Sequence, residues 1–319
     1  MESNKIEVIQ YLVDTRRLWP TASRTADLER EASRPLALLT EEERSRVLKY
    51  YFVADAKMAL ASHLLKHWVV SKYCGIPWTE TKLSADANKK PIFKDAAGRQ
   101  PVVFNVSHQA GLVALVAVHG YDAANGGDSS KVEIGVDVVC VTERQRRDHQ
   151  MIGAEGWPKF VDMHSDVFGR SEAGYLKTGL SSVPAYAGLK TEDARRDYKL
   201  RAFYTLWCLR EAYVKMTGEA LLAAWLGDLM FQRFEPPAPG TRFAQSEDDD
   251  AKQVIRTHDV VFKGRKVEDA NICIRSLGPD YMTCTAVRTP ARKEDALGWH
   301  LGPFKFLTVE QIVKQGEAA

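Results

Sequence analysis

The apolar positions in the first part of the chain follow a helical repeat. Between residues 40 and 72 they recur at the spacing of one buried helix face. The repeat is made by Leu60, Leu64, Leu65 and Trp68. Thr40 followed by Glu43 is a capping-box pattern, and the segment Gly75-Ile76-Pro77 is typical of a helix end. The pattern therefore predicts one long helix over 40–72.

Strand-like runs come next. Residues 102–106 and 112–118 are rich in Val and Leu, and the polar segment 107–111 is predicted to be the turn that joins them. Residues 121–130 are small, polar and rich in glycine, so we expect a loop there. Residues 132–141 form a third apolar run and predict another strand.

The second part of the chain also combines long helical stretches with short strands. Helices are predicted over 160–168 and 194–217, and Gly218 is placed to act as a C-cap. Residues 236–250 are proline-rich and then acidic, which predicts an exposed insertion. Further strands are predicted at 254–262, 272–277 and 282–287. Since each part has a long helix and a few strands, we place a boundary in the loop before Val132.

Composition limits the class of protein. The chain has 319 residues, of which 45% are hydrophobic and 27% charged, an ordinary globular balance. A net charge of +2 does not favour nucleic acid or a membrane surface as partner. There is no run of about 18 apolar residues and no secretory signal pattern, so we expect a cytoplasmic protein. The 5 cysteines form no CxxC pair and are expected to be buried free thiols.

The segment Phe104-Asn105-Val106-Ser107-His108 is the first candidate for chemistry. A strand here is predicted to end in a turn that carries a hydroxyl, an imidazole and free backbone N–H groups. Such a turn can hold phosphate oxygens. The alternative is an ordinary hairpin turn with a hydrogen-bonded histidine.

A single carboxylate in the third apolar run is the second candidate. Asp137 stands in the sequence Ile134-Gly135-Val136-Asp137-Val138, where a charge is costly unless it is paired, hydrogen-bonded or bound to a metal. Gly135 would let a ligand or another backbone approach closely. Oxygen ligands of this kind suit Mg²⁺. The alternative is an aspartate that caps the turn after the strand.

A pair of charged residues on the second long helix is the third candidate. Glu211 and Lys215 are four residues apart and lie opposite an apolar stripe, so they are neighbours on the helix surface. The alternative is a surface salt bridge that contributes a few tenths of a kcal/mol.

Together and in this order, NVSH at 105–108, IGVD at 134–137 and WCLREAYVK at 207–215 resemble the Sfp-type phosphopantetheinyl transferase superfamily. The resemblance extends over 38–221 and is greatest to fungal members. It implies an α+β fold of two similar α/β subdomains related by a pseudo-twofold axis, with coenzyme A between them. We assign the subdomains to 1–131 and 132–319, in one monomeric chain.

The resemblance also implies the reaction and its residues. Such an enzyme moves the 4′-phosphopantetheine group of coenzyme A to a serine of an apo acyl or peptidyl carrier protein and releases 3′,5′-ADP. Asp137 and Glu211 would bind Mg²⁺, or Mn²⁺ in its place. The catalytic residues would be Glu211, Lys215 and His108. Coenzyme A would contact Lys89, Lys90, Pro91, Asn105, Ser107, His108 and Lys215.

Three positions depart from the family pattern. Val139 replaces the acidic residue that often supplies a third metal ligand, so water or the amide oxygen of Gln109 would fill that place. Arg210 replaces a lysine and cannot donate a proton near neutral pH, so Lys215 is the better acid. Ala54 replaces an arginine that holds the 3′-phosphate, and Lys89 or Lys90 would supply this contact.

Two other functions remain open from the sequence. One is a different enzyme that binds coenzyme A, such as an acyltransferase, which would not need paired carboxylates. The other is a scaffold that binds carrier proteins without catalysis. Fungal relatives generally serve polyketide, nonribosomal-peptide and lysine-pathway carriers, and the resemblance implies the same partners here.

Overall fold

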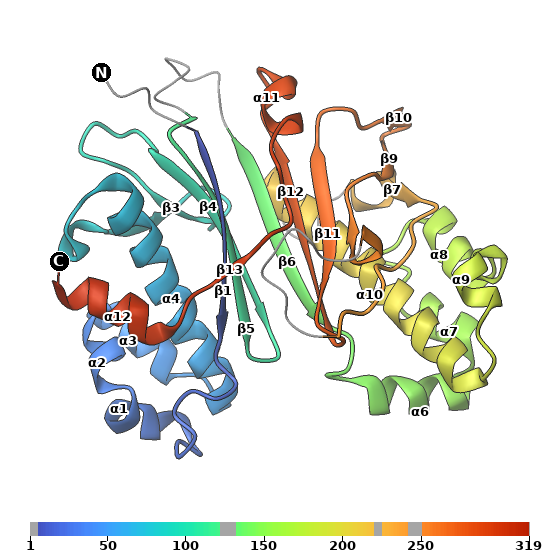
Figure 1. The fold of residues 1–319 in the computed structure, drawn as a ribbon, viewed down its shortest axis with the longest axis horizontal. Helices are drawn as coiled ribbons and strands as arrows, with labels where there is room; N and C mark the ends of the chain where they lie inside the picture. The colour runs from blue at the N-terminus through green and yellow to red at the C-terminus, as the bar shows by residue number, and fades with distance from the viewer. Residues whose placement is uncertain (1–5, 122–131, 220–224, 242–250, 319) are drawn as a thin grey trace.

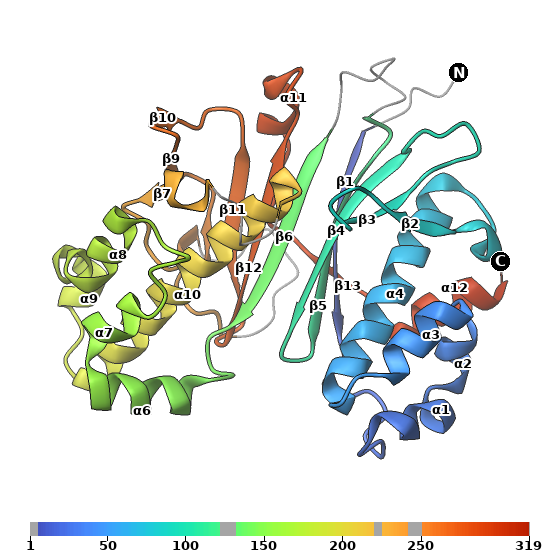
Figure 2. The same cartoon turned by 180° about the vertical axis from the view of Figure 1, so that it is seen from behind.

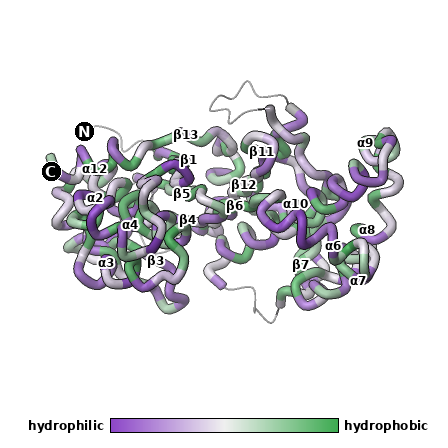
Figure 3. The backbone as a smooth tube through the Cα atoms, turned by 90° about the horizontal axis from the view of Figure 1, so that it is seen from below, coloured by the Kyte–Doolittle hydropathy of each residue, from purple (hydrophilic) through white to green (hydrophobic). Residues whose placement is uncertain are grey.

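A computed structural model describes residues 6–121, 132–219, 225–241 and 251–318. Within these residues, two four-stranded sheets stand face to face with helices on their outer sides (Figure 1). The strand orders are β13-β1-β5-β4 and β6-β12-β11-β8. Seen from below, β4, β5, β6 and β12 lie between the long helices α4 and α10 (Figure 3). This four-layer arrangement confirms the predicted α+β class.

The first half supplies one sheet, a small hairpin and a group of helices. Its strands are β1 (Glu7–Asp14), β2 (Leu83–Ala85), β3 (Pro91–Phe93), β4 (Val102–Gln109) and β5 (Leu112–His119). Its helices are α1 (Leu28–Glu31), α2 (Ser33–Ala37), α3 (Glu41–Leu48) and α4 (Val53–Cys74), with 3₁₀ turns at Thr25–Asp27 and Trp78–Glu80.

The second half begins with β6 (Glu133–Cys140) and continues through mostly helical chain. Its helices are α6 (Gln145–Glu155), α7 (Trp157–Asp162), α8 (Arg170–Lys177), α9 (Pro184–Ala187), α10 (Glu192–Thr217) and α11 (Lys293–Leu297), with 3₁₀ turns at Gly179–Ser182, Leu226–Asp228 and Ala251–Gln253. Its later strands are β7 (Leu229–Gln232), β8 (Val254–Ile255), β9 (Asp259–Phe262), β10 (Arg265–Lys266), β11 (Asn271–Leu277) and β12 (Tyr281–Arg288).

The end of the chain returns to the first half. The short strand β13 (Lys305–Phe306) pairs in parallel with β1, and α12 (Val309–Ala318) packs against α4. Figure 1 shows this segment crossing the molecule to reach α4. A division at residue 131 therefore leaves this segment with the second half in sequence and with the first half in space.

Alternating side chains build the core on both faces of the sheets. In β5, Val113, Leu115 and Ala117 face the helices around α4. The intervening residues Leu112, Ala114, Val116 and Val118 face the other sheet. Because both faces are buried, β5 is an almost continuous apolar run rather than an alternating one.

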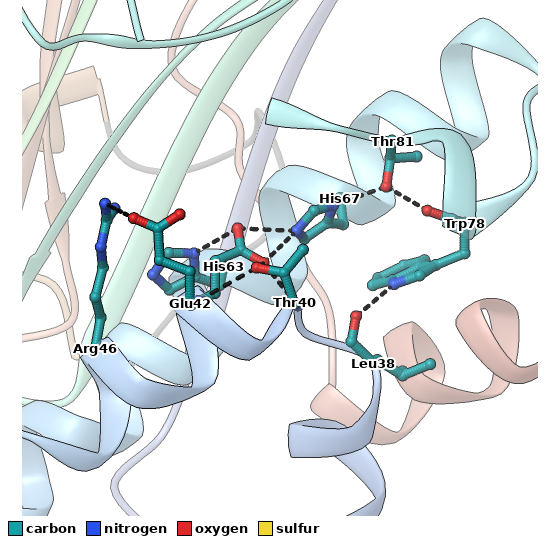
Figure 4. A network of polar contacts seen from close by, with 9 residues as sticks. Leu38, Thr40, Glu42, Arg46, His63, His67, Trp78 and Thr81 are labelled. Carbon is teal, nitrogen blue, oxygen red and sulfur yellow. Dashed lines mark hydrogen bonds and ion pairs between the residues drawn. The ribbon is translucent and has the colours of Figure 1, made fainter. Parts of the chain in front are cut away.

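The predicted helix over 40–72 is in fact two helices. The capping box at Thr40 and Glu43 is confirmed, and Gly75 ends α4 in the left-handed region with φ 63°. The helix breaks between α3 and α4 because α3 folds back onto α4. The Glu43 carboxylate accepts hydrogen bonds from His63 and His67 of α4. Figure 4 shows both histidines turned toward α3, with Thr81 bound to His67.

The predicted turn at 107–111 is wrong at its start. Ser107, His108 and Gln109 continue β4, and only Ala110 and Gly111 turn, with φ 48° and 86°. Polar side chains can extend the strand because β5 pairs with it to the end. Since neighbouring strand residues point to opposite faces, Ser107 and His108 face different layers.

Most of the remaining predicted helices and strands are present, some with different bounds. α10 and its Gly218 cap, with φ 80°, are confirmed, whereas α7 ends at Asp162 instead of residue 168. The predicted strand at 254–262 is interrupted and forms β8 and β9. All five cysteines are free thiols, four of them buried. The predicted loop, apart from Tyr121, and the insertion from residue 242 onward lie outside the described residues.

Among the described helices, none is both long and apolar enough to cross a bilayer.

We expect Gly135→Ala to separate β6 from α10. A Cβ atom at this position would lie 2.1 Å from the Ala212 carbonyl oxygen and 2.4 Å from the Met216 nitrogen, so backbone must move. Overpacking of this kind costs about 1–3 kcal/mol. The free energy of unfolding in urea measures the change.

Gly153→Ala is the matched control. Gly153 lies within α6 with no heavy atom within 4 Å of an added Cβ. Because alanine favours a helix by up to about 1 kcal/mol, this variant should be neutral or more stable. Equal stability of the two variants would show that β6 and α10 do not depend on close approach.

Candidate active site

The site lies where the edge strands of the two sheets meet. β4 and β6 run side by side but belong to different sheets (Figure 2). Side chains of β4 replace the missing backbone ladder. The Val136 N–H donates to Asn105 Oδ1 at 2.9 Å, and the Cys140 N–H donates to Gln109 Oε1 at 3.2 Å. These amides therefore fix the register of the two halves.

A hydroxyl, a carboxylate and an ammonium group meet at this junction. Ser107 Oγ donates to Asp137 Oδ1 at 2.8 Å, and Lys215 Nζ donates to the same oxygen at 2.7 Å. Lys215 Nζ also donates to Ser107 Oγ at 2.9 Å. Ser107 and Asp137 are buried, while Lys215 is partly exposed. The structure thus brings together three predicted residues from β4, β6 and α10.

Gly135 explains why α10 can deliver its lysine to the strand. Gly135, Asp137 and Val139 share one face of β6, and α10 packs on that face. The backbone of Ala212 and Met216 occupies the space where a side chain at 135 would stand. The helix therefore approaches closely enough for Lys215 to reach Asp137.

The two carboxylates of the site repel each other. Burial, followed by the negative charge of Asp137, raises the pKa of Glu211 to about 7, although Lys215 opposes the change. Burial would lower the pKa of Lys215, but attraction to Asp137 outweighs it and raises that pKa. Lys215 is therefore held as an ammonium, and Glu211 can exchange a proton near neutral pH.

His108 lies on the other face of β4 with its side chain exposed. Partial removal of the imidazole from water lowers the pKa of His108, and the positive charges of Lys215 and Lys66 lower it further. The negative charge of Asp55 opposes this shift. His108 therefore belongs to the same electrostatic field as Lys215 without joining the hydrogen-bonded cluster.

The Lys89-Lys90-Pro91 segment closes one end of the junction. Lys90 Nζ donates to the Ile134 carbonyl of β6 at 2.7 Å and to the Lys215 carbonyl at 3.4 Å. Burial lowers the pKa of Lys90 to about 8. Lys89 is exposed and has a φ of 64°. Lys90 therefore ties the first half to the second.

A cavity of about 270 Å³ lies beside the contact between Lys90 and β6. Residues of both halves line it, among them Asp86, Lys90, Pro91, Phe104, Met216 and Gly218. Its walls are partly polar and partly apolar, which suits a nucleotide that carries both a base and phosphates.

Neither of the two substituted family positions on the second half belongs to the hydrogen-bonded cluster. Arg210 is fully buried and donates to Glu172 Oε2 at 2.6 Å and to the Leu229 carbonyl at 2.7 Å. Val139 packs in the apolar cluster around α10. The Gln109 amide oxygen, a predicted third ligand, accepts the Cys140 N–H. Arg210 is thus a structural residue that fixes α10 against α8 and β7.

Sequence reasoning missed the Glu172–Arg210 pair and Lys66. Lys66 is only 8% exposed, on α4. A lysine inside the apolar stretch Leu64-Leu65-Lys66-His67-Trp68 was the available signal, because a charge at buried helix spacing needs a reason.

Comparison with known proteins identifies the family. The family described as "4′-phosphopantetheinyl transferase, N-terminal" matches residues 27–120, and the family described as "4′-phosphopantetheinyl transferase superfamily" matches residues 133–268. The chain belongs to the 4′-phosphopantetheinyl transferase superfamily. The hydrogen-bonded cluster of Ser107, Asp137 and Lys215 joins the two matched regions.

Fungal proteins are among the most similar relatives. The chain is 46% identical over 312 residues to 4′-phosphopantetheinyl transferase 1 of Fusarium mangiferae, covering 98% of this chain and 96% of that protein. It is 34% identical to 4′-phosphopantetheinyl transferase NpgA of Emericella nidulans, covering 96% and 92%. It is 27% identical to the L-aminoadipate-semialdehyde dehydrogenase-phosphopantetheinyl transferase of Schizosaccharomyces pombe, covering 68% and 70%.

We expect Arg210→Met to destabilise the second half strongly. It leaves the buried Glu172 carboxylate without its cation, which costs about 3–5 kcal/mol in comparable buried pairs. Adding Glu172→Gln removes the stranded charge and should recover part of the loss. The free energy of unfolding in urea distinguishes the single from the double variant.

Arg196→Met is the control on the same helix. Arg196 pairs with Asp193 at the exposed start of α10, and removal of such a pair changes stability by about 1 kcal/mol at most. An Arg210→Met variant no less stable than this control would contradict the structural role of Arg210.

Proposed function

We propose that this protein transfers the 4′-phosphopantetheine group of coenzyme A to a serine of an apo acyl or peptidyl carrier protein and releases 3′,5′-ADP. The cluster of Ser107, Asp137 and Lys215, with Glu211 beside it, is the observation that carries this proposal. Relatives that match nearly the whole chain bear the name of this activity, which supports it.

Asp137 and Glu211 fit a divalent cation, which we propose to be Mg²⁺ with Mn²⁺ as a substitute. The negative charge of Asp137 helps raise the pKa of Glu211, so a cation between the two carboxylates would relieve their repulsion. Around them, the described residues hold no group of three or more His, Cys, Asp or Glu side chains suited to a metal. Water and substrate oxygens would complete the shell, as Mg²⁺ commonly accepts. The ion would neutralise charge on the pyrophosphate.

The protein residues divide the remaining work. Lys215 stays protonated and would stabilise negative charge that develops on the leaving 3′,5′-ADP. Its raised pKa makes it a weaker acid, so charge stabilisation is the role that the site favours. Glu211, with a pKa of about 7, is suited to accept the proton of the attacking serine. Ser107 would hold Lys215 and the phosphates in register, and His108 would contact a phosphate.

Coenzyme A would occupy the space between the two halves. The cavity beside Lys90 and Pro91 has walls from both halves, and Lys89 is exposed near it. The Asn105 side chain already accepts the Val136 N–H, so it would contribute its remaining N–H₂ group. Because one chain supplies both sides, we propose that a monomer suffices, with 1–131 and 132–319 as its halves.

The relatives suggest partners for the reaction. The Schizosaccharomyces pombe relative is named for L-aminoadipate-semialdehyde dehydrogenase, so we infer that lysine-pathway carriers are among the substrates. Carriers of polyketide and nonribosomal-peptide synthesis are the second inferred group. An acyltransferase that binds coenzyme A would leave the paired carboxylates unexplained, and an inactive scaffold would leave the Asp137–Lys215 contact unexplained.

Mass spectrometry of an apo carrier protein incubated with the enzyme, coenzyme A and Mg²⁺ tests the activity directly. We expect the mass to rise by one phosphopantetheine group, and to stay unchanged when a chelator is added. No gain with several unrelated apo carriers would overturn the proposal.

Asp137→Asn and Glu211→Gln should each lower kcat by about 100-fold or more, because each removes charge that the transition state needs. Circular dichroism would show whether the fold survives. Glu192→Gln, at the exposed start of α10, is the matched control and should keep full turnover. Wild-type turnover in either site variant would exclude that carboxylate from the metal site.

A further inference from the structure

His67 is a buried residue of α4 whose two ring nitrogens both make hydrogen bonds. It is 3% exposed. Its Nε2 atom lies 3.1 Å from Glu43 Oε1 and 3.0 Å from Glu43 Oε2, and its Nδ1 atom lies 2.7 Å from Thr81 Oγ1. Figure 4 shows the ring between Thr81 and the start of α3. The positions of the ring protons follow from what these partners can donate.

Thr81 cannot donate to the imidazole. A threonine hydroxyl has a single proton, and Thr81 Oγ1 donates it to the Trp78 carbonyl oxygen at 2.6 Å. The hydroxyl oxygen is therefore an acceptor toward His67. Nδ1 of His67 must carry a proton to make this contact.

Glu43 cannot donate to the imidazole either. Burial alone would raise the pKa of Glu43, but hydrogen bonds from His63 and His67 outweigh it and hold that pKa well below its usual range. The carboxylate also accepts from the backbone N–H and the hydroxyl of Thr40. An ionised carboxylate has no proton to give, so Nε2 of His67 must also donate. A histidine that donates from both nitrogens is an imidazolium ion.

The indole of Trp78 adds a second partner suited to a cation. Its ring centre lies 5.5 Å from that of His67, with 36° between the ring planes. Cations within about 6 Å of an indole are attracted by its ring electrons. Trp78 is itself held in place, because its Nε1 donates to the Leu38 carbonyl at 2.8 Å.

The surrounding charges leave Glu43 as the partner that decides the charge of His67. The titratable and charged groups on the neighbouring elements are Glu43 and Arg46 on α3, His63 and Lys66 on α4, and Glu80 in the 3₁₀ turn. Burial lowers the pKa of His63, so that ring is neutral and donates to Glu43 from Nδ1. The positive charge of Lys66 opposes a second cation nearby, whereas the contact with both oxygens of Glu43 favours it. Arg46 is paired with Glu42, and Glu80 is exposed.

We propose that His67 carries a proton on both ring nitrogens at neutral pH, and that this buried imidazolium is a pH-sensitive latch that fastens α3 and the Trp78–Glu80 turn to α4. The inference is independent of the proposed function. Loss of the Nε2 proton would set a lone pair against the carboxylate. Loss of the Nδ1 proton would leave either this nitrogen or the Trp78 carbonyl without a donor. Either change leaves a buried polar atom unsatisfied, which is costly.

The direction of the pH dependence follows from proton linkage. A histidine in an unfolded chain releases its proton near pH 6.5. Above that pH, a folded state that keeps the proton on His67 binds one proton more than the unfolded state. Stability therefore falls as pH rises, by up to about 10-fold in the unfolding equilibrium constant for each pH unit. The latch is strongest in mildly acidic to neutral solution and weakens in alkaline solution.

Nuclear magnetic resonance of the full chain labelled with ¹⁵N-histidine tests the protonation state in the wild-type protein. The signals of His67 are those lost in His67→Arg. At pH 7.5 we expect a bound proton on both of its ring nitrogens. A single protonated nitrogen at this pH would overturn the proposal.

Urea unfolding at pH 7 and pH 8 tests the linkage. His67→Arg keeps a cation at both pH values, and His67→Gln is neutral at both. Relative to either variant, we expect the unfolding equilibrium constant of the wild type to rise about 3- to 10-fold between the two pH values. A wild-type pH dependence equal to that of both variants would overturn the latch.

His63→Gln is the matched control on the same helix and the same carboxylate. Because His63 is neutral when folded, this variant should keep the pH dependence of the wild type. Amide hydrogen exchange at pH 7 then locates the effect: in His67→Gln, α3 and the Trp78–Glu80 turn should exchange faster relative to α10 than in the wild type. Unchanged exchange of α3 relative to α10 would show that His67 does not fasten α3, and would overturn the proposal.

Discussion

A buried carboxylate that must be partnered from other elements organises this protein. Asp137 stands in the middle of an apolar strand, where an unpaired charge would cost several kcal/mol. Ser107 from the neighbouring sheet and Lys215 from α10 both bind its Oδ1 atom. The chain therefore cannot satisfy Asp137 without bringing its two halves and its longest helix together. The contacts that pair the Asp137 carboxylate are thus the same contacts that form the site.

The unpaired edge of a sheet is usually covered by a helix or loop, or blocked by charged residues. In this protein the unpaired edges of β4 and β6 lie against each other. Asn105 and Gln109 use side-chain amides to complete the junction, and Lys90 reaches across it to carbonyl groups of β6 and α10. The two strands are therefore joined by hydrogen bonds to side chains in place of a continuous backbone ladder. The returning segment of β13 and α12 adds a covalent crossing that keeps the halves from separating.

The buried cations of the molecule serve different purposes, and their partners show which. Arg210 is fully buried and binds Glu172 and backbone carbonyls through its two terminal nitrogens, so it acts in the core. Lys215 is matched by Asp137 but remains partly exposed, which suits a group that meets a substrate.

The sequence by itself determined the α+β class, the long helices with their caps, and the residue types of the site, because hydrophobic spacing and short motifs are local. It could not show that Ser107 and His108 face opposite layers, since that depends on β4 continuing past its apolar part. It could not show that Arg210 points into the core. These facts depend on which distant groups surround a side chain, and only the packing of the two halves decides that.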